Sequence, residues 1–201
     1  RRQIAKLALE KLMADGRIQP ARIEEFVEKA KQDLALDIKK AGEEALYKMS
    51  ITGIDPKLVG IVGRLKYRTS YGQNILIHSM EVGYLSGIIA SELGLDSAKA
   101  KKCGFFHDIG KSVDQETQGS HPEIGHMILK KFSMDEDICQ AALTHHQDKP
   151  YNIYSTIAKA ADAISGARIG ARKDSYEQFV ARLQDLEKTA SSFPGIDKVY
   201  A

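Results

Sequence analysis

A histidine and an aspartate stand side by side at the end of an apolar run, in the stretch Phe-Phe-His107-Asp108-Ile-Gly-Lys111. The residues before them repeat at helical spacing from an N-cap at Asp96, which puts His107 on the inward face of a helix. An ionised Asp in apolar surroundings is unfavourable unless a positive group meets it. The pair, with Lys111 behind it, therefore suggests a cation and an anionic substrate. By itself, however, a single His–Asp pair is more typical of a hydrogen-bonded buried histidine.

Further potential metal ligands are spread along the chain. A helical pattern over residues 73–93 carries His78 in a core-facing position. His121 lies in the first turn of a helix that begins with a capping box of Ser120 and Glu123. His126, on the same helix, lies off the apolar stripe and is predicted to be exposed.

Three more candidates lie on two later helices. The pattern over residues 135–145 places His145 on an apolar face, and His146 follows at its end. Asp162 interrupts a row of small side chains in a helix over residues 155–166, where helix propensity does not explain a carboxylate. Five of the 6 histidines lie on inward faces or at helix ends. If each were an ordinary core histidine, this placement would have to arise independently five times. We therefore predict one shared metal site built from His78, His107, Asp108, His121, His145, His146 and Asp162.

The types and number of these ligands restrict the metal. Imidazoles together with Asp carboxylates suit Zn, Mn, Fe or Ni better than the oxygen cage of Ca. Seven ligands are too many for one ion, so the natural partition has the Asp108 carboxylate bridging two ions, which in such sites lie about 3.5–4 Å apart. The expected cofactor is thus two divalent metal ions, with Mn, Mg, Zn and Fe not distinguished.

The elements that must position these side chains all read as helices. Residues 1–14 and 20–49 follow helical spacing, and the long second segment, covered with Glu and Lys, reads as a packing or dimerising helix. Asp55 and Pro56 open a short helix. Gly60 and Gly63 in it have the GxxG spacing of KH domains, but their position inside a helix favours a chance match. No strand-like alternation stands out, so the predicted fold class is all-α, a helical bundle with an N-terminal long-helix extension.

Composition narrows the class of protein. A net charge of +2 over 201 residues gives no global basic field, so any nucleic-acid contact must come from a local patch. The two cysteines form no CxxC pair and read as reduced core residues. No apolar run approaches the roughly 18 residues that a membrane span needs. Because the chain begins with Arg inside a helical pattern, we expect it to be part of a longer protein.

The ligand order His…His-Asp…His…His-His…Asp resembles the HD superfamily of metal-dependent phosphohydrolases. More narrowly, three runs resemble the ribonuclease Y family: residues 63–74 (GRLKYRTSYGQN), residues 107–111 (HDIGK) and residues 163–172 (AISGARIGAR). Residues 15–24 (DGRIQPARIE) resemble the segment that joins the KH and HD domains of that family. The ligands alone indicate only the superfamily, whereas the flanking runs are much more specific.

The resemblance implies a domain organisation and a cellular setting. Residues 1–52 would be the end of the KH region with a connecting long helix, residues 53–190 the HD domain, and residues 191–201 a truncated C-terminal tail. The complete protein would also have a coiled coil and an N-terminal anchor, and would be cytoplasmic and held at the inner face of the cell membrane. Its expected activity is endonucleolytic cleavage of single-stranded RNA in mRNA turnover and processing. A homodimer and RNA-degradation partner proteins are the other expected associations.

The resemblance also implies roles for individual residues. His78, His107, Asp108 and Asp162 would hold one ion, while His121, His145 and His146 complete the second, with Asp108 shared. One of the two adjacent histidines could act only indirectly, because consecutive helical residues point about 100° apart. Asp108 and Lys111 are the expected catalytic residues, with Lys111 meeting a phosphate oxygen. Asp114 is either a proton-transfer partner or a solvated loop residue, and the candidates for the RNA backbone, or otherwise solvated arginines, are Arg68, Arg168 and Arg172.

Two other functions stay open. An HD-type phosphodiesterase of cyclic or small nucleotides would use the same ligands, but the run His145-His-Gln-Asp-Lys-Pro150 lacks the GYP-type loop of the branch that cleaves cyclic dinucleotides. A dimerising scaffold with a degenerate site is the alternative from a different class, and the complete ligand set argues against it.

Overall fold

The computed structural model describes residues 1–114, 116–168, 173–193 and 199, and it confirms the predicted all-α class. Among these residues, the side chains of residues 173–179 and 182 are not described. The elements in chain order are α1 (Arg2–Asp15), α2 (Pro20–Lys48), α3 (Pro56–Arg64), the 3₁₀ helix η1 (Leu65–Tyr67), β1 (Thr69–Ser70), β2 (Gln73–Asn74), α4 (Ile75–Glu92), α5 (Ser97–Phe106), the 3₁₀ helix η2 (Ile109–Ser112), α6 (His121–Lys131), α7 (Glu136–Thr144), α8 (Ile153–Ala167) and α9 (Lys173–Ser191).

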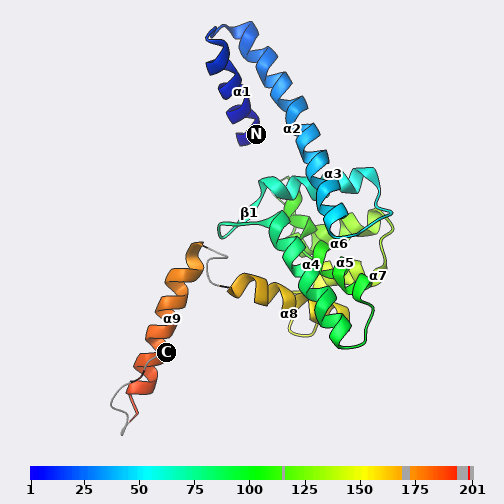
Figure 1. Cartoon of the computed structure of the whole chain (residues 1–201), viewed down its shortest axis with the longest axis vertical. Coiled ribbons are helices and arrows are strands. Elements are labelled where there is room, and N and C mark those ends of the chain that lie inside the picture. The colour runs from blue at the N-terminus through cyan, green and yellow to red at the C-terminus, as the bar shows by residue number, and fades with distance from the viewer. Residues whose placement is uncertain (115, 169–172, 194–198, 200–201) are drawn as a thin grey trace.

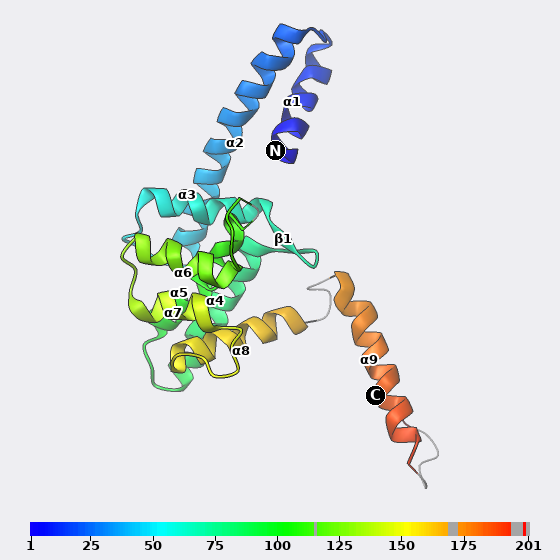
Figure 2. The same ribbon diagram turned by 180° about the vertical axis from the view of Figure 1, so that it is seen from behind.

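Helices α3 to α8 form a bundle, and the α1–α2 hairpin projects from it (Figure 1). Only the C-terminal end of α2 packs on the bundle, where it meets α3, and α9 lies outside it, as the reverse view also shows (Figure 2). The larger cluster of buried apolar side chains in the core includes Leu58, Leu65, Phe105, Phe106 and Ile109. A smaller one consists of Ala90, Ala100 and Ile157. Both cysteines, Cys103 and Cys139, are buried and unpaired. In the described part of the chain, no helix combines the length and the apolar character that crossing a bilayer requires.

The helix that carries His78 begins two residues later than predicted. Thr69–Ser70 and Gln73–Asn74 pair as a short antiparallel hairpin, with Tyr71 and Gly72 at its turn in positive-φ conformations. Two-residue turns with this geometry match the twist of an antiparallel pair. The Asn74 side chain then accepts from the backbone N–H of Ile77 and caps α4. Sequence periodicity missed this hairpin because two residues a strand are too few for alternation to be detected.

Helices α2 and α3 are packed with their backbones in contact. A Cβ added at Gly63 would overlap the carbonyl oxygen of Ile38, and one added at Gly42 would overlap that of Val59. Close approach of this kind is possible only without a side chain. Gly60, in contrast, has open space around it. Gly60 and Gly63, which have the GxxG spacing of a KH loop, thus lie inside helix α3. Gly63 allows α3 to pack closely on α2.

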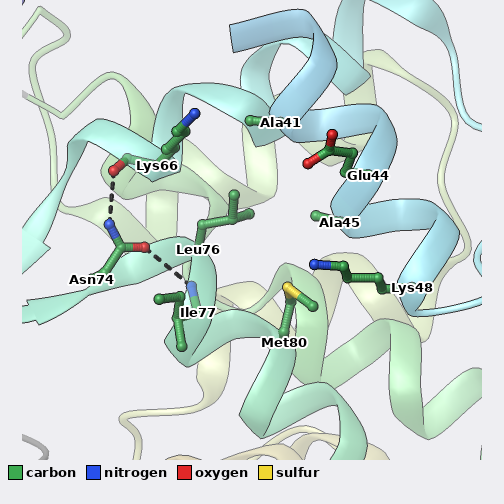
Figure 3. A pocket seen from close by; sticks show the side chains of 9 residues that line it. All are labelled: Ala41, Glu44, Ala45, Lys48, Lys66, Asn74, Leu76, Ile77 and Met80. Carbon is green, nitrogen blue, oxygen red and sulfur yellow. Dashed lines mark hydrogen bonds between the residues drawn. The ribbon is translucent and has the colours of Figure 1, made fainter. Parts of the chain in front are cut away.

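A cavity of about 420 Å³ lies between the end of α2 and the beginning of α4. Figure 3 shows Glu44 and Lys48 of α2 facing Leu76, Ile77 and Met80 of α4 across it. None of the predicted metal ligands lines this cavity. It is therefore separate from the predicted site.

Candidate metal centre

The end of α5 directs two adjacent side chains to the same place. The helix ends at Phe106, and His107 still has helical backbone angles, whereas Asp108 has left them. This change of direction lets neighbours that would diverge on a helix converge, and both side chains are almost fully buried. Gly110 allows the chain after Asp108 to approach α6 closely, because a Cβ at this position would overlap the carbonyl oxygen of His121. The segment η2 can therefore lie directly against the first turn of α6.

The other predicted ligands approach from four further helices. His78 lies on α4, His121 in the first turn of α6, and Asp162 on α8. Helix α7 ends at Thr144, so His145 caps it and His146 lies in the following turn. Because the second histidine has left the helix, both rings can reach the same region. The packing of these helices on one another brings all seven predicted residues together, from five segments of the chain.

One group of ligand atoms surrounds Oδ2 of Asp108. Nε2 of His107 lies 3.4 Å from this oxygen and Nε2 of His78 lies 3.9 Å from it. Oδ1 of Asp162 is 3.0 Å from Nε2 of His78 and 3.9 Å from Nε2 of His107. Two carboxylates and two imidazoles thus converge, with spacings that leave room for a cation between them.

A second group faces the other oxygen of the same carboxylate. Oδ1 of Asp108 lies 3.4 Å from Nε2 of His121 and 3.8 Å from Nε2 of His145. Nε2 of His146 is 3.2 Å from Nε2 of His121. The three histidines could hold one metal ion, and His78, His107 and Asp108 could hold another. Asp108 therefore has one oxygen in each group.

Hydrogen bonds on the far side of the rings orient the imidazoles. Nδ1–H of His107 donates to the carbonyl oxygen of Gly104 at 2.7 Å, and Nδ1–H of His145 donates to that of Ala142 at 2.9 Å. These acceptors assign the proton to Nδ1 and leave the Nε2 lone pair facing the centre, which is the arrangement that metal-binding histidines need.

The unpaired atoms of the centre fit a bound cation. Among the described residues, Nε2 of His107, Nε2 of His145 and Oδ1 of Asp108 are buried and have no hydrogen-bond partner. An unsatisfied buried polar atom costs about 1–3 kcal/mol, and these three all point into the same space. Because each is a lone-pair donor, a metal ion satisfies all of them where another hydrogen-bond acceptor could not.

The protonation states are those of a ligand set. Burial by itself would raise the pKa of Asp108, but His107 and Lys111 hold that pKa well below its usual range. Burial also acts against ionisation of Asp162, yet His78 and His107 lower its pKa. Both acids are therefore carboxylates at neutral pH.

The pKa values of the histidines shift in different directions because their charged neighbours differ. Burial lowers the pKa of His145 to about 3 and that of His121 to about 4, and it lowers the pKa of His146. These three rings are neutral ligands at pH 7. Burial would also lower the pKa of His107, but Asp108 and Asp162 raise it above its usual value. The two carboxylates thus attract positive charge at this point, which a metal ion would provide.

Lys111 and Arg68 form the border of the centre. Nζ of Lys111 donates to Oδ2 of Asp108 at 2.7 Å, and the Lys111 side chain remains 20% exposed. Nε of Arg68 donates to the carbonyl oxygen of Lys111 at 2.6 Å, and its guanidinium also pairs with Asp114. Arg68, which lies between η1 and β1, therefore ties this segment to η2, and Asp114 is engaged in an ion pair with it.

The other two arginines predicted to bind RNA are Arg168 and Arg172. Arg168 is 52% exposed and pairs with Glu81. Arg172 lies outside the described residues.

The prediction that His126 is exposed is wrong, because the residue is partly buried. Its Nε2 atom is inaccessible to solvent and has no hydrogen-bond partner among the described residues. It is not among the residues that group as metal ligands.

Three residues that support the centre were missed by sequence reasoning. Gly110 permits the contact between η2 and α6, and Glu81 and Ser165 make hydrogen bonds behind His78. A glycine two residues after a His–Asp pair and a serine three residues after Asp162 were visible in the sequence. Their roles were not, because each depends on a contact between segments far apart in the chain.

Known proteins resemble this chain along its whole length. The HD domain family matches residues 75–167, which hold all seven predicted ligands. Ribonuclease Y of Clostridium novyi is 52% identical over the whole chain, which spans 40% of that relative. Ribonuclease Y of Thermotoga maritima is 52% identical with the same coverage, and that of Syntrophotalea carbinolica is 50% identical, with 39% of it covered. No solved structure matches the chain. With similarity to ribonuclease Y along its full length and an HD domain that contains the His/Asp centre, the chain belongs to the ribonuclease Y family.

Proposed function

We propose that this chain hydrolyses phosphodiester bonds of single-stranded RNA as a metal-dependent endoribonuclease. The observation that carries the proposal is the Asp108 carboxylate, which has one oxygen 3.4 Å from His107 and the other 3.4 Å from His121. A carboxylate between two groups of imidazoles is the donor arrangement of a two-metal hydrolase.

Two divalent ions would share the seven side chains. His78, His107, Asp108 and Asp162 would hold one, and His121, His145 and His146 would hold the other with Asp108. When bound, such ions supply Lewis acidity and lower the pKa of water towards neutrality. Mn, Mg, Zn and Fe are all compatible with this donor set.

The chain's own groups would bind and orient the phosphate. Lys111 is close to Asp108 and partly exposed, so its ammonium group can meet a non-bridging phosphate oxygen at the edge of the centre. Arg168, and Arg172 by its position in the sequence, are candidates to contact the RNA backbone. The lowered pKa values of His121 and His145 keep these rings unprotonated, so they do not compete with Lys111 for phosphate charge.

The RNA substrate is supported by the relatives, whose name is that of a ribonuclease. The chain spans about 40% of their length, so the properties of the whole protein are proposals as well. They comprise a homodimer, RNA-degradation partner proteins, and a cytoplasmic location at the inner face of the membrane. We also propose that residues 1–52 comprise the end of a KH region and a connecting long helix, that residues 53–190 form the HD domain, and that residues 191–201 form a C-terminal tail.

The direct test is cleavage of a 5′-labelled single-stranded RNA of about 30 nucleotides by the purified chain. We expect internal cuts with Mn²⁺, no cuts after EDTA treatment, and recovery when Mn²⁺ is added back in excess, because the donors remain in place without the ion. Cyclic dinucleotides are assayed in parallel. Turnover of those alone would contradict the RNA assignment and favour the small-nucleotide phosphodiesterase. Metal analysis that finds no bound ion under any loading condition would favour a scaffold.

Replacing Arg68 by alanine should lower kcat more than it raises KM. Arg68 holds the Lys111 carbonyl, so its loss frees η2 and displaces the ammonium group, with a decrease in kcat of about ten- to a hundredfold, as for other residues that orient a metal site. Steady-state kinetics on the labelled RNA gives the two constants separately. Arg64→Ala is the matched control, since Arg64 is a neighbouring exposed arginine paired with Glu116. A rise in KM alone would instead identify Arg68 as an RNA-backbone contact.

A further inference from the structure

A chain of hydrogen bonds runs from His78 towards the surface. Nδ1 of His78 lies 3.0 Å from Oγ of Ser165, and this hydroxyl donates to Oε2 of Glu81 at 2.8 Å. Nε2 of Gln73 is 3.5 Å from both of these oxygens. Glu81 also pairs through Oε1 with Arg168. Ser165 is 1% exposed and His78 is 2% exposed, so water does not compete for the inner part of this chain.

The direction of each hydrogen bond follows from the number of protons available. A carboxylate can only accept, so the single hydroxyl proton of Ser165 is directed to Glu81. The lone pairs of that hydroxyl then face His78 and can only accept, which requires the ring proton on Nδ1. The Nε2 lone pair of His78 is left to face the centre. This direction of the hydrogen bonds is important because Oδ1 of Asp162 lies 3.0 Å from Nε2 of His78. Without it, this carboxylate would favour the tautomer with the ring proton on Nε2.

We propose that Glu81 and Ser165 are positioning residues that hold His78 in its metal-binding tautomer. The inference rests on the proposed metal site. It adds two hydrogen bonds that keep the ring proton on the side of His78 away from the metal. His107 and His145 obtain the same polarity from backbone carbonyls. The structure gives His78 a hydroxyl instead, which can donate or accept, and Glu81 removes that ambiguity by accepting the hydrogen bond of this hydroxyl.

The alternative is that Ser165 is simply a packed core serine, and helix α8 offers a matched control for it. Ser155, on the same helix, is equally buried, and its hydroxyl has no hydrogen-bond partner among the described residues. Ser155→Ala therefore removes a buried hydroxyl of the same kind without touching a ligand. Glu81→Leu and Glu81→Gln form a second pair, because only the glutamine keeps an oxygen that can accept from Ser165.

The experiment measures Zn²⁺ affinity of the full chain by competition with a chromophoric chelator, with no substrate present. We expect Ser165→Ala to weaken binding at the His78 side by about ten- to a hundredfold, the usual effect of removing a partner of a metal-bound histidine. Glu81→Leu should weaken it in the same direction. Ser155→Ala and Glu81→Gln should stay within about threefold of the native chain. In the Zn²⁺-loaded native protein, ¹H–¹⁵N correlation of the imidazoles should give a slowly exchanging Nδ1–H signal for His78, which is lost in Ser165→Ala.

Unchanged Zn²⁺ affinity in both Ser165→Ala and Glu81→Leu would overturn the inference, as would an equal loss in Ser155→Ala. A native chain that binds no Zn²⁺ would overturn it together with the metal site. Native protein that binds Zn²⁺ and shows the expected pattern but cleaves no RNA supports the inference while contradicting the proposed function. Circular dichroism of every variant identifies any loss that comes from unfolding.

Discussion

Asp108→Asn should abolish RNA cleavage while leaving the helical circular dichroism of the chain unchanged. We expect the rate to fall by roughly 10³- to 10⁶-fold, the range found when a central member of a catalytic unit is removed. The asparagine has the same shape and volume, so the packing around it at the end of α5 is preserved. The effect should therefore appear in chemistry and metal binding, with little change in fold.

The physical reason is the double use of this carboxylate. Its two oxygens face different groups of imidazoles, so losing its charge weakens both metal positions at once. The amide also brings N–H donors where lone pairs are needed, against Nζ of Lys111 2.7 Å away and against the Nε2 atoms of the histidines. Metal content after Mn²⁺ or Zn²⁺ loading, measured by elemental analysis, should fall together with activity.

Asp96→Asn is the matched control, with the same change of charge at the opposite end of α5. Asp96 caps α5 by accepting from the backbone N–H of Lys99, and asparagine is an equally good N-cap. Activity should stay near the native value in this variant. Native-like cleavage by Asp108→Asn, in protein free of the native enzyme, would rule out the two-metal mechanism.

Gly63→Ala should destabilise the chain by about 1–3 kcal/mol or more, as overpacking of a close contact does. A Cβ at this position overlaps the carbonyl oxygen of Ile38, which is backbone and cannot rotate away. Helix α3 must therefore shift from α2, and α3 also adjoins η2, the segment that carries Lys111. Urea unfolding followed by circular dichroism measures the free energy of unfolding.

Gly60→Ala tests whether the effect comes from the close contact. Gly60 lies one turn earlier on α3, and a Cβ there meets nothing within 4 Å. Removing a glycine from a helix interior stabilises it by about 0.5–1 kcal/mol, so this variant should be as stable as the native chain or more so. Equal destabilisation by the two alanines would contradict the packing of α2 on α3 described above.

Part of the centre was predictable because several of the predicted ligands lie on regular helices or at their ends. Helical periodicity places His78 and His107 on inward faces, and the capping box places His121 at the start of α6. The all-α class follows from the same periodicity. The exposure of His126 was predicted wrongly because the position of a residue relative to the apolar stripe of its own helix does not report which other helices cover it.

The sequence by itself determined which side chains are available as ligands and which helices carry them, because residue type and 3.6-residue periodicity are local properties. Only the tertiary structure decided that the two oxygens of Asp108 face different groups of histidines, that Arg68 turns inward to hold Lys111, and that Ser165 lies behind His78. These features depend on the packing of segments up to 87 residues apart. That packing is decided by close contacts, such as those at Gly63 and Gly110, that no local pattern encodes.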